Sequence, residues 1–198
     1  MRMVISEFIS LDGVVQAPGG SQEDTDGRFE HGGWSMPFFD PETMGGAFDR
    51  TVRGADALVF GRRTWTTMAS AWPDRAGDPF ADLMNGIPKH MASRKLAPAD
   101  LEWNNSHLLP ANDAVAGVRE LLTAPGRDLL MMGSPNFAAQ LITAGVVDEF
   151  VLMIEPVVLG GGKRLFPDDG HLRALDLVDH QVSATGVHIC TYRPAANT

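Results

Sequence analysis

Two arginines stand side by side directly after a short apolar run, in the stretch LVFGRRTW at residues 58–65. Ligands of open α/β sheets bind beyond the carboxyl ends of the strands. A helix that begins at Arg62 offers unpaired backbone N–H groups, while Gly61 allows close approach and Thr64 adds a hydroxyl group. Arg62 or Arg63 can add a forked contact to a phosphate. We interpret this stretch as a phosphate clamp; the alternative is a pair of surface arginines at a solvated helix end.

The stretch MMGSPN, residues 131–136, is a second place where an apolar strand meets a glycine at a helix start. Backbone amides around Gly133 and Ser134 are suited to face an anion, and the missing Cβ of Gly133 would leave room for a ligand. On its own, this stretch is better explained as an ordinary strand-to-helix turn that Ser134 caps. The ligand-binding interpretation therefore depends on the arginine pair.

A third glycine-rich stretch, LGGGKRLF at residues 159–166, places three glycines before Lys163 and Arg164. It looks like a phosphate loop but does not match the Walker pattern. That pattern needs a glycine where Val157 stands, and Arg164 replaces the required serine or threonine. A nucleoside triphosphatase is therefore excluded, and the absence of GxGxxG argues against a standard dinucleotide-binding fold.

Other familiar chemistries find no support in the residue spacing. The six histidines show no paired spacing such as HExxH, so we predict no metal site. No GxSxG stretch is present, and a hydrolase with an activated serine is therefore unsupported.

An apolar patch and a few acids complete the set of candidate residues. The patch consists of Trp34, Met36, Phe38 and Phe39. It either packs in the core or forms a flat wall for a planar ring, and both interpretations stay open. The acids nearest the candidate site are Asp12, Glu42 and Glu155, although most acids in a protein are simply solvated.

The composition limits the kind of protein and its partners. The chain has 198 residues, 44% of them hydrophobic, which is enough for one sizeable core. A net charge of −9 makes nucleic acid an unlikely main partner, so any anion site must be local. The single cysteine, Cys190, fits a reducing compartment. Glu7 and Asp12 interrupt any signal-peptide core, and no apolar stretch suits a bilayer, so we expect a soluble cytoplasmic protein.

Alternating strand and helix patterns must position these candidates. Apolar or β-rich runs predict strands at 2–11, 55–60, 89–93, 106–109, 128–132 and 146–159, and a hairpin around 184–186. Periodic runs predict helices at 41–53 with Asp40 as N-cap, from 62 to 68, at 112–122 with Asn112 as N-cap, and at 135–145. Residues 12–33 and the Pro/Gly-rich segment 73–88 are predicted as loops. This order predicts a single three-layer α/β domain over residues 1–198, with a mostly parallel mixed sheet and a C-terminal antiparallel hairpin.

Three motifs occur in the order SLDGVV, VFGRRTW and MGSPNFAAQLITAGVVDEFVLMIEPVVLGGGKRLF. Together they resemble the dihydrofolate reductase-like superfamily, and most closely the reductase domain of the bifunctional riboflavin-biosynthesis deaminase-reductase and its stand-alone bacterial relatives. The resemblance covers nearly the whole chain. It implies a three-layer fold with an eight-stranded sheet, NADPH as the hydride donor, and a homodimer.

The resemblance also implies roles for the residues that match its motifs. The residues implied to bind the cofactor are Gly61, Arg62, Arg63 and Thr64 at its phosphates, Ser93 and Arg94 near the adenosine 2′-phosphate, Gly133 and Ser134 under the pyrophosphate and nicotinamide, and Gly160, Gly161 and Gly162 at the edge of the cleft. The strand-one region from Phe8 to Gly13 would line the nicotinamide and substrate. The substrate would lie between the 13–33 loop and the Trp34–Phe39 segment.

One departure from the family pattern concerns the proton donor. Dihydrofolate reductases carry an acid early in the first long helix, and Gly45 stands near that position here. Glu42 lies one turn away, and Glu42, Asp12 or water are the remaining sources of a proton. No zinc motif of the deaminase domain is present.

These observations lead to a main hypothesis and its alternatives. The main hypothesis is an NADPH-dependent reductase of a small planar heterocycle, similar to 5-amino-6-(5-phosphoribosylamino)uracil reductase. The alternatives are a non-catalytic NADP(H)-binding protein, a dihydrofolate or pteridine reductase, and a dimerising module without a ligand.

Overall fold

Strand β1 (Arg2–Ser10) lies in the middle of the sheet and buries its two faces in different helical layers. Met3 and Ile5 pack on one face and Val4 on the other, because successive side chains of a strand point to opposite faces. The structure is a computed structural model that describes residues 1–196. Burial on both faces is typical of a parallel strand covered by helices on both sides.

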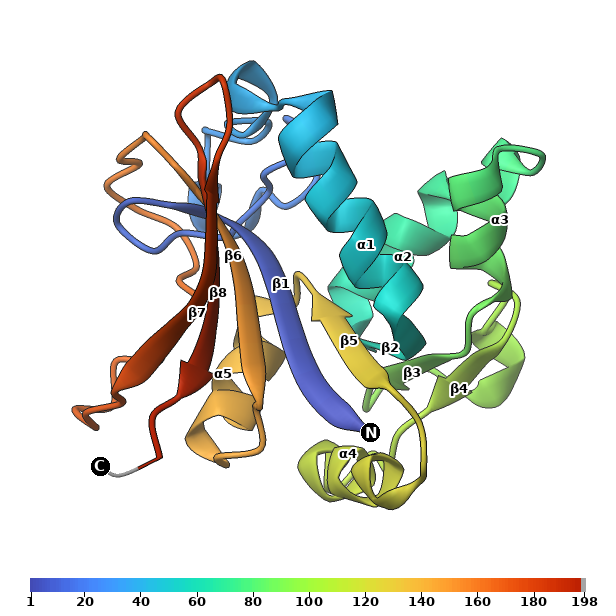
Figure 1. The fold of residues 1–198 in the computed structure, drawn as a ribbon. Coiled ribbons are helices and arrows are strands. Elements are labelled where there is room, and N and C mark those ends of the chain that lie inside the picture. Colours follow the sequence, from blue (N-terminus) through green and yellow to red (C-terminus); the bar gives the residue numbers. More distant parts are fainter. Residues whose placement is uncertain (197–198) are drawn as a thin grey trace.

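The sheet contains eight strands in the order β4-β3-β2-β5-β1-β6-β8-β7 (Figure 1). The other strands are β2 (Ala55–Gly61), β3 (Lys89–Ala92), β4 (Ser106–Leu108), β5 (Asp128–Met132), β6 (Glu149–Glu155), β7 (Leu175–Val182) and β8 (His188–Pro194). Neighbours from β4 to β6 are parallel, whereas β8 is antiparallel to both β6 and β7. The predicted mostly parallel sheet with a C-terminal antiparallel hairpin is confirmed.

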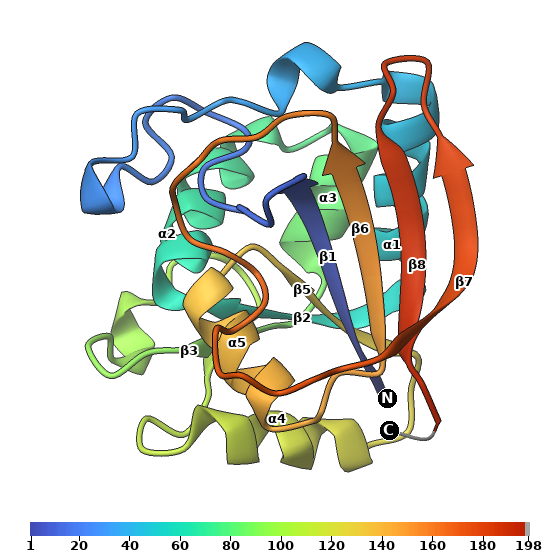
Figure 2. The ribbon, with the colours of Figure 1, turned by 90° about the vertical axis from the view of Figure 1, so that its left-hand side faces the viewer.

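Helices cover both faces of the sheet (Figures 1 and 2). The helices are α1 (Gly46–Gly54), α2 (Arg62–Ala71) and α3 (Pro79–Gly86) on one face, and α4 (Ala114–Thr123) and α5 (Pro135–Thr143) on the other. Val52, Trp65 and Met84 anchor the first layer, and Val118 and Phe137 anchor the second. The predicted three-layer α/β fold is therefore confirmed. Within residues 1–196, no helix is long and apolar enough to cross a membrane.

Helix α3 is absent from the sequence-based prediction, which assigned residues 73–88 to a surface loop. Asp78 caps this helix, because its carboxylate accepts hydrogen bonds from the backbone N–H groups of Phe80 at 2.9 Å and Ala81 at 3.0 Å. Pro79 occupies the first helical position, where its missing N–H costs nothing. The proline therefore starts a helix here instead of marking a loop.

The caps of the other helices follow the prediction more closely. Asp40 accepts hydrogen bonds from the N–H groups of Glu42 and Thr43, as predicted, although the first turn, Pro41–Gly45, is a π-helix that leads into α1. The N-cap of α4 is Asp113 rather than the predicted Asn112, because the Asp113 carboxylate accepts from Ala116 N.

Unequal strand lengths open a cleft at the carboxyl edge of the sheet. The pairing of β1 with β5 ends at Ser6 and Met132, whereas its pairing with β6 continues to Ser10. On the other side of β5, β2 continues past the end of β5 and pairs with β3 up to Gly61. The last residues of β1 and β2 therefore stand on either side of a gap above β5, where ligands of such sheets bind.

Candidate functional site

Two adjoining cavities occupy the carboxyl edge of the sheet, and each has a volume of about 410 Å³. The first is lined by the β2–α2 and β5–α5 turns, the segment after β3 and residues 110–115. The second is lined by the end of β1, loop residues 15–19, 23–24, 35–36 and 39, and α2. Both cavities contact Asp24, Arg63, Thr64, Ser134 and Pro135. The two cavities therefore adjoin one another along these shared residues.

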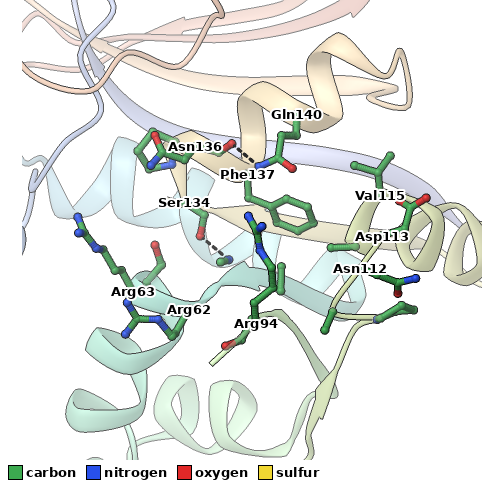
Figure 3. A pocket seen from close by; sticks show the side chains of 18 of the residues that line it. Arg62, Arg63, Arg94, Asn112, Asp113, Val115, Ser134, Asn136, Phe137 and Gln140 are labelled. Carbon is green, nitrogen blue, oxygen red and sulfur yellow. Dashed lines mark hydrogen bonds between the residues drawn. The ribbon is translucent and has the colours of Figure 1, made fainter. Parts of the chain in front are cut away.

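The first cavity holds two arginines that are free to bind an anion (Figure 3). Arg62 comes from the start of α2, and Arg94 extends from the segment after β3 towards α5. Neither side chain forms an ion pair within residues 1–196. Because Ser93 lines the same wall, this part of the cavity combines two guanidinium groups with a hydroxyl group, a set that suits a phosphate.

Arg63, in contrast, is engaged in a cluster of four charges between the two cavities. Its Nη1 contacts Asp26 Oδ2 at 2.5 Å, and Lys163 Nζ contacts Asp24 Oδ2 at 2.6 Å and Asp26 Oδ2 at 3.0 Å. The hydrogen bond from Arg63, followed by that from Lys163, lowers the pKa of Asp26 to about 2. The cluster ties the start of α2 to the 12–33 loop and to the segment before Arg164.

A side-chain hydrogen bond joins the two glycine turns to one another. Ser134 Oγ accepts from the backbone N–H of Gly61 at 2.8 Å, and this bond is drawn in Figure 3. Ser134 has a left-handed backbone with φ of 63° and makes no side-chain cap of α5. The Gly61 amide is thus already occupied by a protein acceptor.

Gly133 has no open space beside it, contrary to the expectation from the sequence. A Cβ at this position would lie 2.9 Å from Thr64 Cγ2, and its φ of +70° disfavours other residues. The glycine therefore permits the turn and the contact with Thr64. Its backbone still lines the second cavity, beside the end of β1.

The second cavity is mostly apolar but carries an acid on its floor. Its apolar walls come from Phe8, Met36, Phe39, Phe48, Met68 and Trp72. Glu7 is only 4% exposed, and its Oε1 has no hydrogen-bond partner among the described residues. Burial raises the pKa of Glu7 well above its ordinary value, and the charge of Glu23 adds to the rise, whereas the backbone N–H of Gly133 opposes it.

The two acids proposed from the sequence lie outside both cavities. The Asp12 carboxylate contacts Ser10 Oγ at 2.7 Å and accepts from the N–H groups of Leu159 at 3.1 Å and Gly160 at 2.9 Å. These hydrogen bonds, with that of Ser10 the largest, lower the pKa of Asp12 to about 2. Glu42 is exposed on the π-helical turn. Asp12 therefore holds a turn in its ionised form, and Glu42 lines neither cavity.

The remaining predicted residues divide between the site and its surroundings. Phe8 lines the second cavity, as do Met36 and Phe39 from the apolar patch. Trp34 is buried behind the wall, where its Nε1 donates to the carbonyl oxygen of Gln16 at 2.8 Å. Gly13 lies outside both cavities, at a left-handed turn with φ of 83°.

The glycines of the third glycine-rich stretch lie apart from the two cavities. Gly161 and Gly162 line a separate hollow with residues 26–31, and the Gly160 amide is bonded to Asp12. Only Lys163, the next residue along the chain, reaches the first cavity.

Comparison with known proteins finds one family model that matches the chain. A family model of the RibD C-terminal domain matches residues 2–189. The protein YyaP of Bacillus subtilis (strain 168) is 27% identical over 191 residues, which cover 94% of this chain and 91% of YyaP.

Solved structures share the fold at low sequence identity. A protein described as a riboflavin biosynthesis protein from Shewanella sp. PV-4 superposes with a TM-score of 0.70 at 18% identity, covering 98% of this chain and 99% of that one. A pyrimidine reductase-like protein from Corynebacterium diphtheriae gives 0.62 at 17% identity, with 99% and 92% covered. The diaminohydroxyphosphoribosylaminopyrimidine deaminase/5-amino-6-(5-phosphoribosylamino)uracil reductase of Thermotoga maritima gives 0.64 at 12% identity, with 98% of this chain and 56% of that chain covered. With the family match spanning nearly all its residues, the chain belongs to the RibD C-terminal domain family.

Proposed function

We propose that this protein is an NADPH-dependent reductase of a small planar heterocyclic substrate, and that it is similar to 5-amino-6-(5-phosphoribosylamino)uracil reductase. The observation that carries the proposal is the pair of joined cavities, one with free guanidinium groups and one with apolar walls. Family membership supports a reductase related to the riboflavin pathway.

The residues present fit a phosphorylated dinucleotide. Arg62, Arg94 and Ser93 would hold phosphate groups in the first cavity, where the protein's negative charge is locally reversed. Thr64 and Ser134 line both cavities and would contact the middle of the ligand. The nicotinamide ring would enter the apolar second cavity, and a reduced nicotinamide supplies the hydride when it is bound.

The second cavity also limits the substrate. Aromatic and thioether side chains such as Phe39, Phe48 and Met68 provide flat, adaptable walls for a planar ring. Glu7 on the floor provides one polar contact that fixes orientation. A heterocycle with a polarised C=N or C=O bond meets both requirements, because its planar ring suits the apolar walls and its polar bond suits the contact with Glu7.

Calorimetric titration with NADPH and NADH tests the cofactor. We expect NADPH to bind more tightly by roughly ten- to a hundredfold, because a charge-assisted hydrogen bond contributes about 1.5–3 kcal/mol. Arg94→Ala should remove most of this preference, whereas Arg53→Ala, an exposed arginine of α1 paired with Asp49, should leave it unchanged. Equal affinities for the two cofactors at low salt would contradict the proposal.

A non-catalytic NADP(H)-binding protein is the second candidate, favoured by the position of Asp12 and Glu42 outside the cavities. Oxidation of NADPH in the presence of phosphoribosylaminopyrimidine, dihydrofolate or simple quinones separates the two candidates. Binding without turnover of any of them would favour the second, and brisk turnover of dihydrofolate would identify a pteridine reductase. The resemblance further suggests a homodimer, and the expected location is the cytoplasm. Sedimentation velocity would reveal the dimer.

A further inference from the structure

Glu7 owes its position to the unequal lengths of the central strands. Parallel pairing between β1 and β5 ends at Ser6, so Glu7 is the first residue of β1 that no longer has β5 beside it. Its neighbour there is the Gly133 turn, which lines the second cavity together with Glu7. A side chain that would otherwise be enclosed in the core thus faces a cavity.

The carboxyl group of Glu7 is buried with no cation of the described residues beside it, and only the backbone N–H of Gly133 favours its charged form. It is 4% exposed, and Oε1 accepts no hydrogen bond within residues 1–196. Isolated carboxylates are costly to bury, and such groups take up a proton instead. The raised pKa of Glu7 is consistent with this geometry.

The charged groups around the second cavity favour the neutral form. Besides Glu7, the ionisable residues that line it are Glu23, Asp24 and Arg63. Glu23 accepts from the N–H groups of Gly19 and Gly20, and Arg63 and Asp24 belong to the four-charge cluster. No cation in the described part of the chain forms an ion pair with Glu7.

We propose that Glu7 is the proton donor of the reduction, as a neutral carboxylic acid on the floor of the second cavity. The proposal rests on the reductase function argued above. The proton leaves the carboxyl oxygen and bonds to the nitrogen or oxygen of a polarised C=N or C=O bond of the substrate. The carbon of that bond would receive a hydride, which carries the two electrons of the reduction and which a bound reduced nicotinamide would supply. Glu7 is left as a carboxylate and regains a proton from water.

Glu155 provides a matched control. It is fully buried, its Oε2 has no partner in the described residues, and burial raises its pKa to about 8. However, its Oε1 accepts from Ser35 Oγ at 2.6 Å, and it lines neither cavity. Glu7 and Glu155 thus share burial and differ in access to the site.

Infrared spectroscopy of the ligand-free protein gives the first readout. At pH 7 the wild type should show the C=O stretch of a neutral carboxyl group that Glu7→Gln removes; a glutamate with the ordinary pKa of 4.5 would be ionised. If the spectra of wild type and Glu7→Gln coincide in this region at pH 7, Glu7 is ionised and the proposal fails.

Turnover of NADPH with the phosphoribosylaminopyrimidine gives the second readout. Glu7→Gln should lower kcat by at least about a hundredfold, the usual contribution of a general acid, with the NADPH Kd unchanged. Glu7→Asp should recover part of the rate, and Glu155→Gln should keep it. The wild-type kcat should fall as pH rises through the pKa of Glu7, because the neutral form is the donor.

The outcomes separate the two proposals. Wild-type turnover by Glu7→Gln with the normal pH profile would overturn the role of Glu7 while leaving the reductase intact. Failure of the wild type to bind NADPH would instead overturn the proposed function, whatever the infrared spectra show. Melting curves of Glu7→Gln and Glu7→Asp establish that both variants are folded before rates are compared.

Discussion

Lys89 at the amino end of β3 and Glu7 near the carboxyl end of β1 are both buried ionisable side chains, but their surroundings differ. Lys89 Nζ donates to the carbonyl oxygens of Asn85, Ile87 and Asn104 at 2.8–2.9 Å and lies 4.4 Å from the centre of the Trp103 ring. Glu7 has an oxygen without a partner among residues 1–196.

The hydrogen-bond partners of a buried ionisable side chain indicate whether it stabilises the fold or serves the site. Asn85 belongs to the last turn of α3, where carbonyl groups have no partner within the helix. Lys89 satisfies such groups and joins α3 to the segment before β4, and it lines none of the cavities described. Glu7, in contrast, has an oxygen, Oε1, without a partner among the described residues, and it lines a cavity. An unpartnered buried group is the one that calls for an explanation beyond folding.

The largest expected effect comes from Lys89→Met, which should destabilise the protein by about 3 kcal/mol, since three carbonyl oxygens lose a charged donor at once. Urea unfolding measures the loss, and Lys95→Met, at an exposed position, is the control. The NADPH affinity of the folded variant should not change, because Lys89 lines neither cavity. If Lys89→Met lowers the free energy of unfolding by no more than Lys95→Met does, Lys89 is not the anchor of α3.

At high pH, Glu7→Gln should stabilise the protein, whereas Lys89→Met destabilises it. Between 4.5, the ordinary value for glutamate, and its raised pKa, the folded state holds a proton that the unfolded state has lost. Wild-type stability therefore falls as pH rises through this interval, by about 1.4 kcal/mol for each unit of the rise in pKa. Glu7→Gln removes this contribution, so the variant should match the wild type near pH 4.5 and exceed it at pH 8. Urea unfolding of both proteins between pH 4.5 and pH 8 gives the free energy of unfolding at each pH. If the difference between wild type and Glu7→Gln does not change with pH, Glu7 is not an unpaired buried acid.

Local patterns in the sequence predict the alternation of strands and helices and the arginine-bearing turn, because these depend on runs of neighbouring residues. The fold class, the hairpin and the Asp40 cap are all recovered in this way. Helix α3 is missed because proline and glycine at its ends suggest a loop, although Pro79 and Gly86 are the first and last residues of a helix.

The floor of the site depends on pairings that no local pattern reveals. In the sequence, Glu7 merely interrupts an apolar run; its exposure to a cavity follows from where β5 stops beside β1. Gly133 suggests room for a ligand, but Thr64, from a turn far away in the chain, fills that space. Glu7 is not among the predicted site residues, and the one sequence signal available for it is a charged residue in the middle of a core strand.

The smallest expected effect on stability comes from a third kind of charge, one that is paired but near the surface. The Lys163 side chain is 18% exposed and contacts Asp24 and Asp26, so Lys163→Met should lower the free energy of unfolding by about 1 kcal/mol or less, and by less still at high salt.

The effect of Lys163→Met on NADPH binding should be clearer than its effect on stability. Lys163 and Asp24 line the first cavity, and the variant leaves the two carboxylates balanced by Arg63 alone. We therefore expect NADPH affinity to fall several-fold at low salt and to recover partly as salt screens the carboxylates. Arg173→Gln breaks a comparable pair with Asp169 outside both cavities and should leave affinity unchanged. Equal NADPH affinities for the two variants would mean that the cluster only fastens the loop, and that Arg62 and Arg94 alone set the charge of the first cavity.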